Sequence, residues 1–115
     1  MAQTETVQVH RERILRVVRH LQDHLDRDLS IDELASIASF SEFHFHRIFR
    51  EIVGEPVAEH VRRLRLERAA LELYYTDRPI KRNAADVGYG SHAALTRAFL
   101  AQFGATPAEY RARLA

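Results

Sequence analysis

The chain has 115 residues, enough for one small domain or two very small ones, and it has no cysteine, which excludes disulfide and thiolate chemistry. It contains no apolar run of about twenty residues that would span a membrane and no leader before the first amphipathic segment, so we expect a soluble, cytoplasmic protein. The net charge is only +1, but residues 77–113 carry six cations against three acids. Apolar residues recur at intervals of three and four throughout, which predicts an all-α fold of seven helices.

The first predicted unit is a helix-turn-helix subdomain at residues 10–54, preceded by a flexible polar arm at residues 1–9. Its first helix is expected at residues 10–25. Ser30 and Glu33 have the spacing of a capping box, which begins a second helix. A turn at Ser39 leads to Ser41, which is placed to cap a third helix that Gly54 ends.

A long linker helix is predicted next, within a segment at residues 55–76, and it would span about 30 Å. Its apolar residues predict an inner side made of Val57, Val61, Leu64, Leu71 and Tyr75. A second helix-turn-helix subdomain is expected at residues 77–115, with helices starting near 79 and 92 and a capping box at residues 106–109 that starts the last helix.

The second helix of each unit has one apolar face and one face left for an external partner. In the first unit the inward residues are Phe45, Ile48, Phe49 and Ile52, and the outward ones are Phe43, Arg47 and Arg50, with His46 on the flank. In the second unit the inward residues are Leu95, Ala98, Phe99 and Gln102, and the outward ones are Ala93, Thr96, Arg97 and Leu100, with His92 near the first turn. A solvated face is the alternative interpretation of both patterns.

Helix-turn-helix units commonly place a helix in the major groove of DNA, where arginine reads guanine and small side chains approach the thymine methyl group. Two such helices on a linker of about 30 Å could enter successive grooves, which lie about 34 Å apart on one side of the duplex. One chain would then read an asymmetric site.

Several motifs along the chain resemble the DNA-binding domain of the AraC/XylS family of bacterial transcription regulators. They are LSIDELA at residues 29–35, SEFHFHRIF at 41–49, RLRLERA at 63–69, VGY at 87–89 and FG at 103–104. The HFHR run at residues 44–47 resembles the branch of multidrug and superoxide regulators, some of which carry a C-terminal drug-sensing domain. The resemblance implies base-reading positions at Phe43, His46 and Arg47 and at His92, Ala93, Thr96 and Arg97.

Two residues in the second unit depart from the family pattern. Asn83 stands on an inward stripe where an aliphatic residue is usual, and an unpaired buried amide costs about 1 to 3 kcal/mol. Leu100 stands where the family often has a cation. We therefore expect Asn83 either to form a hydrogen bond with a backbone group or to make the second unit less stable. We also expect the second unit to contribute less than the first to sequence discrimination.

Three functional hypotheses remain open. The first is a sequence-specific regulator of double-stranded DNA that recruits RNA polymerase and binds as a monomer if the chain is complete. The second is the N-terminal part of a longer ligand-sensing regulator, and the third is a helical protein-interaction module. Neither a catalytic constellation nor a cofactor motif is evident, so no enzyme is predicted. His20 and His24 share a helix face, but no third metal ligand is evident.

Overall fold

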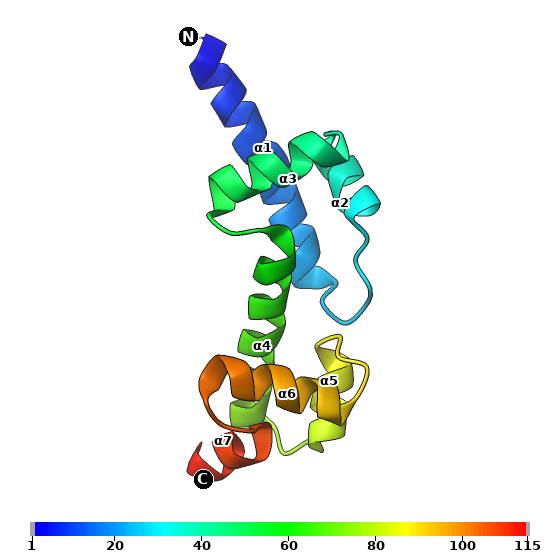
Figure 1. Ribbon diagram of the computed structural model, residues 1–115, viewed down its shortest axis with the longest axis vertical. Helices are drawn as coiled ribbons and strands as arrows, with labels where there is room; N and C mark the ends of the chain where they lie inside the picture. The colour runs from blue at the N-terminus through cyan, green and yellow to red at the C-terminus, as the bar shows by residue number, and fades with distance from the viewer. Residues whose placement is uncertain (1, 115) are drawn as a thin grey trace. The chain divides into compact units, whose positions relative to one another are not determined.

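The computed structural model describes the backbone of residues 2–114 and the side chains of residues 5–114. Its helices are α1 (Ala2–Asp23), α2 (Ile31–Ala38), α3 (Glu42–Val53), α4 (Val57–Tyr75), α5 (Ile80–Asp86), α6 (His92–Phe103) and α7 (Pro107–Leu114), as Figure 1 shows. The described part of the chain contains no strand, and this confirms the predicted all-α fold. None of its helices combines the length and apolar character that a membrane span needs.

The chain folds as two compact units, each with its own core. Unit 1 consists of Met1–His24 and Leu29–Val61, and unit 2 consists of Leu25–Asp28 and Arg62–Ala115. In unit 1, buried side chains of α1, α2 and α3 form the core: Ile14, Val17, Leu21, Leu34, Phe45, Ile48 and Phe49. In unit 2 the core is built by α4, α5 and α6: Leu66, Ala69, Leu73, Ala84, Val87, Leu95 and Phe99. The boundary lies inside α4, which passes from one unit to the other without a break.

The predicted N-terminal arm is wrong for the described residues, because α1 begins at Ala2. No glycine or proline interrupts residues 2–9, and Gln8 donates a hydrogen bond to Glu12 one helical turn later, at 3.2 Å. Val7 lines a shallow hollow together with Ile48 and Ile52 of α3. The helix therefore extends beyond the amphipathic stripe from which the sequence prediction started.

The predicted inner side of α4 is correct at its start and wrong at its end. Val57 is buried, whereas Leu71 and Tyr75 are 59% and 76% exposed. The buried residues of the second half are instead Leu66, Ala69 and Leu73. Because α4 contributes to two different cores in turn, no single stripe along the helix describes its buried face.

Asn83 on α5 is fully buried, as predicted, and its amide is paired with side chains instead of a backbone group. Its Nδ2 donates to Glu72 Oε2 at 3.1 Å, and its Oδ1 accepts from Arg111 Nη2 at 3.1 Å. Arg111 also donates to the carbonyls of Leu73, Thr76 and Arg78 at 3.4, 3.2 and 2.6 Å. The amide therefore joins a network at the C-terminal end of α4 in which both of its polar atoms have a partner.

Replacing Arg111 by alanine is expected to lower the free energy of unfolding of unit 2 by about 2 kcal/mol, because it leaves the buried Asn83 amide one partner short. The double variant Arg111→Ala/Asn83→Leu is expected to be less destabilised than Arg111→Ala alone, since no amide is then buried. Urea denaturation of the single and double variants measures both values. An additive pair would show that the two side chains are not coupled.

Arg65 of α4 likewise donates hydrogen bonds to backbone carbonyls, here in the segment Leu25–Asp28. Its Nε donates to the Leu25 carbonyl at 3.1 Å and its Nη2 to the Arg27 carbonyl at 2.9 Å. Gly88 lies against the same group with a φ of +86°, and a Cβ at this position would overlap the Leu25 oxygen and lie 2.9 Å from Arg65 Nε. Beside it, burial raises the pKa of Tyr89 while Arg65 and Arg62 oppose the shift.

The last helix begins with the predicted capping box. Thr106 N donates to Glu109 Oε1 at 3.3 Å, and Glu109 N donates to Thr106 Oγ1 at 3.2 Å. These hydrogen bonds lower the pKa of Glu109. A lowered carboxylate pKa stabilises the folded state above the unfolded-state pKa, so this stabilisation of α7 is lost as the pH falls through the folded-state pKa.

Candidate nucleic-acid interface

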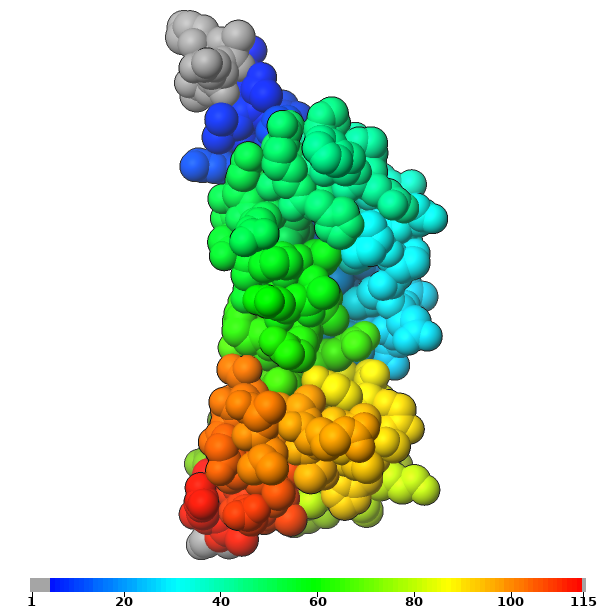
Figure 2. Space-filling view, in the orientation of Figure 1, coloured from blue at the N-terminus to red at the C-terminus, as the bar shows by residue number. Residues whose placement is uncertain are grey.

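The first candidate reading helix is α3, which lies on the surface of unit 1 (Figure 2). Its start is fixed by Ser41, whose Oγ accepts a hydrogen bond from His44 N at 3.3 Å, and it ends at Gly54 with a φ of +91°. Phe45, Ile48 and Phe49 are buried beneath it, whereas the predicted inward residue Ile52 is 38% exposed. The buried residues orient the opposite face of α3 outward.

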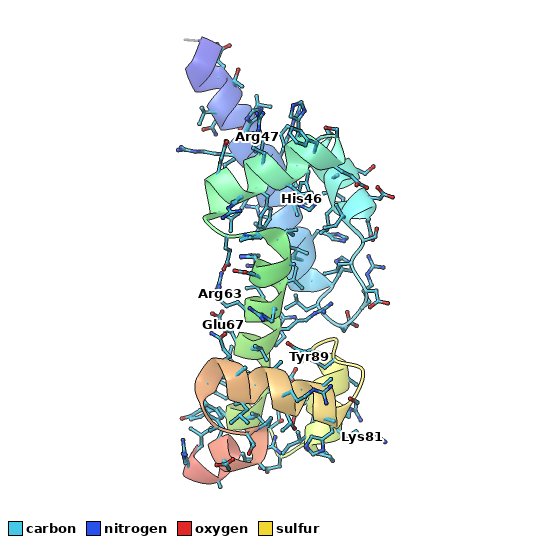
Figure 3. The ribbon with its side chains drawn as sticks, in the orientation of Figure 1. His46, Arg47, Arg63, Glu67, Lys81 and Tyr89 are labelled. Atoms are coloured by element: carbon cyan, nitrogen blue, oxygen red, sulfur yellow. The ribbon has the colours of Figure 1, made fainter. Side chains whose placement is uncertain are left out.

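The three residues predicted on the outer face of α3, and His46, predicted on its flank, are all exposed: Phe43, Arg47, Arg50 and His46. Phe43 is 76% exposed, so its ring is not packed under a neighbouring helix. Among the described residues, neither Arg47 nor Arg50 forms an ion pair. Figure 3 shows His46 and Arg47 extending from α3. The face therefore presents an aromatic ring, an imidazole and two guanidinium groups to solvent.

The turn between α2 and α3 is held by residues of α1 that the sequence prediction missed. Ser39 adopts the left-handed conformation, with φ 59° and ψ 38°. Arg13 Nη1 donates to the Ser39 carbonyl at 3.3 Å, and its guanidinium lies over the Phe40 ring at 5.2 Å from the centroid. His10 packs edge-on against the same ring at 5.2 Å. These contacts set where α3 begins and link its position to α1.

The second candidate reading helix is α6, on the surface of unit 2 (Figure 2). Ser91 caps it by accepting a hydrogen bond from Ala94 N at 3.1 Å, and Gly104 ends it. Leu95 and Phe99 are buried as predicted, but Gln102, predicted to point inward, is exposed. At this end of α6 the inward contacts are made by the next residue, Phe103, whose ring centroid lies 4.6 Å from that of Phe99 and 6.3 Å from that of Tyr110.

The outer face of α6 carries fewer polar groups than that of α3. His92, Ala93 and Arg97 are exposed, Thr96 is partly buried, and Leu100 is 46% exposed. Arg97 is the only cation of α6, so this face offers one charge where α3 offers two. A helix with this surface can approach a groove closely, but it has few cationic or polar side chains that could bind phosphates.

His20 lies in the last turn of α1, and His24 follows the end of that helix. The rings of His20 and His24 stack with centroids 4.1 Å apart, and His20 Nε2 lies 3.5 Å from Glu33 Oε1. His24 Nδ1 is 2.8 Å from the His20 carbonyl, so that nitrogen acts as a donor. Within residues 5–114, no group of three histidine or acidic side chains could hold a metal ion.

Comparison with known proteins identifies the family. A sequence model of a helix-turn-helix domain matches residues 34–113. The AraC-type DNA-binding regulator of Chromobacterium violaceum superposes with a TM-score of 0.83 at 25% identity, covering 91% of this chain and 94% of that one. The DNA-binding domain of AdpA, solved with a target DNA, gives 0.83 at 30% identity, over 87% and 90% of the two chains. The chain belongs to the AraC/XylS family of transcription regulators.

The curated relatives agree with this assignment. The regulatory protein SoxS of Escherichia coli K12 is 36% identical over 105 residues, which are 91% of this chain and 98% of SoxS. The right origin-binding protein of the same strain is 40% identical over 91 residues, or 79% of this chain and 32% of that protein. This member of the family is thus a sequence-specific DNA-binding transcription regulator, and the predicted resemblance to the superoxide-regulator branch is confirmed.

Proposed function

We propose that α3 and α6 are the two DNA-reading helices of this regulator and that each enters a major groove. The observation that carries the proposal is the outer face of α3, on which Phe43, Arg47 and Arg50 are exposed without an intramolecular ion pair among the described residues. The capped N-termini of α3 and α6 add free backbone amides, which favour phosphate oxygens.

We assign distinct roles to the side chains of α3. Arg47 would donate two hydrogen bonds to a guanine, and His46 would donate or accept one at a neighbouring base edge. Phe43 has no polar atom and would contact a thymine methyl group. Arg50, one turn beyond His46 and two turns beyond Phe43, would bind a backbone phosphate. On α6, Arg97 would contact a guanine, and Thr96 and Ala93 would pack near thymine, with His92 close to the backbone.

The proposal extends to the assembly on DNA. The two units share the continuous helix α4, which has 19 residues, and we infer that the chain reads two base blocks about one helical turn apart. One chain then suffices for a whole site, so we propose a monomer that contacts RNA polymerase while bound to DNA in the cytoplasm. The family consists of regulators, and we assign no catalytic role to any residue.

The experiment that tests this function is a selection from random DNA duplexes with the purified chain, repeated with Arg47→Ala and Arg97→Ala. Two enriched blocks about 10 base pairs apart, each lost with one variant, are the expected result. A single block that depends only on Arg47 would restrict base reading to α3. Absence of any enriched sequence would contradict the proposal for both helices.

A further inference from the structure

A basic groove lies on α1, outside the candidate DNA interface. Its volume is about 520 Å³, and it is lined by Val9, Glu12, Arg13, Leu15, Arg16, Arg19 and Ser39. Three arginines and one glutamate give this lining a formal charge of +2. Val9 and Leu15 are 41% and 45% exposed between these charges. The groove therefore combines apolar surface with an excess of cations.

Two of the arginines are available to an external partner. Arg13 is engaged with the Ser39 carbonyl and the Phe40 ring. Arg16 and Arg19 are both exposed, and neither forms an ion pair within the described part of the chain. Glu12, the one acid in the groove, accepts a hydrogen bond from Gln8. Within the described part of the chain, no ion pair thus compensates the two guanidinium charges.

The position of these arginines separates them from DNA bound at α3. With about 100° between successive helical residues, Arg16 and Arg19 stand about 160° and 140° around α1 from the buried Ile14. The buried side of α1 packs against α2 and α3, and α3 exposes Arg47 on the side opposite its own buried residues. Packed helix axes are about 8 to 10 Å apart. Arg16 and Arg19 therefore lie on the side of α1 that faces away from α3, and the groove reaches the turn before α3 only at Ser39.

We propose that this groove is a docking site for an acidic protein segment that carries apolar side chains. Carboxylates would pair with Arg16 and Arg19, and an aliphatic or aromatic side chain would cover Val9 and Leu15. Complementary charge favours encounter with such a partner, and the apolar contact excludes water from the pairs. The inference rests on the proposed orientation of α3 toward DNA, because that orientation leaves the groove open in the bound state.

The test uses the full chain bound to its selected duplex and, as a probe, a short capped peptide of alternating glutamate and leucine. Amide chemical shifts should move along α1 between Val9 and Arg19. The double variant Arg16→Gln/Arg19→Gln should weaken peptide binding about tenfold. Arg11→Gln is the matched control, because Arg11 is an exposed arginine of the same helix that lines a separate hollow with Ile48 and Glu51. It should leave the peptide affinity unchanged.

Four outcomes would overturn the docking proposal. A glutamine-leucine peptide that binds equally well would show that charge does not select the occupant. Loss of duplex affinity and of its salt dependence in the double variant would make the groove a phosphate-binding site. Loss of a dimer in sedimentation, again in the double variant, would assign the groove to a second copy of the chain. Unmoved amide shifts on α1 would exclude peptide docking there. A chain that selects no duplex would instead contradict the proposed function, which the selection tests independently of any peptide.

Discussion

Arg47→Ala is expected to reduce affinity for the selected duplex by roughly 5- to 150-fold, which corresponds to about 1 to 3 kcal/mol for a bidentate contact to guanine. Arg47 is exposed on α3 and is held by no ion pair among the described residues, so its removal should cost little folding stability. Affinity for a random duplex should fall much less, because only one positive charge is lost. Competition binding with the two duplexes measures both effects.

Arg50→Ala is the matched control, since it removes the same side chain from the same helix face. As a phosphate contact it should weaken binding to both duplexes by a similar factor, and it should reduce the slope of log affinity against log salt by about 1. Arg47→Ala should instead relax the choice of base at one position. If both variants weakened all sequences equally, α3 would hold DNA without reading it.

Arg97→Ala is expected to have a smaller effect than Arg47→Ala. The face of α6 carries one cation, and the exposed Leu100 offers neither a hydrogen bond nor a charge. A helix held weakly against the backbone positions its base contacts less firmly. Equal losses for the two arginine variants would contradict the unequal division of reading between the helices.

Local signals in the sequence were sufficient to predict where most helices begin and end. Ser30, Ser41 and Ser91 each accept a hydrogen bond from a backbone amide three residues later, and Gly54 and Gly104 end α3 and α6 in the left-handed conformation. Capping depends on a few consecutive residues, so it can be recognised without tertiary structure. The outward faces of α3 and α6 follow from helical periodicity for the same reason.

Features that depend on distant residues were not predictable in this way. The partners of Asn83 lie 11 and 28 residues away, on α4 and α7. Exposure of Leu71 and Tyr75 arises because α4 serves two cores, which periodicity within one helix cannot reveal. The contact of Arg13 with the Ser39 turn joins residues 26 apart. The candidate reading residues themselves remain a prediction from periodicity and family resemblance, and binding experiments must test them.

Gly88→Ala is expected to destabilise unit 2 by about 4 kcal/mol, the largest effect on stability that we predict. A left-handed backbone costs a residue with a Cβ about 1 to 2 kcal/mol, and forcing an extra carbon into a filled space costs about 1 to 3 kcal/mol more. At Gly88 both costs apply, because the φ is +86° and the new Cβ would overlap the Leu25 carbonyl oxygen. Backbone atoms cannot move aside as a flexible side chain can.

Gly54→Ala and Gly104→Ala separate the two contributions. Their φ values are +91° and +74°, and a Cβ at either position would meet no atom within 4 Å. Each should therefore cost only the backbone part, about 1 to 2 kcal/mol. Urea denaturation of the three variants, combined with amide exchange to assign the loss to a unit, measures the difference. If Gly88→Ala cost no more than the two controls, the segment Leu25–Asp28 would have to move freely away from Arg65, and the hydrogen bonds that hold it would contribute little to unit 2.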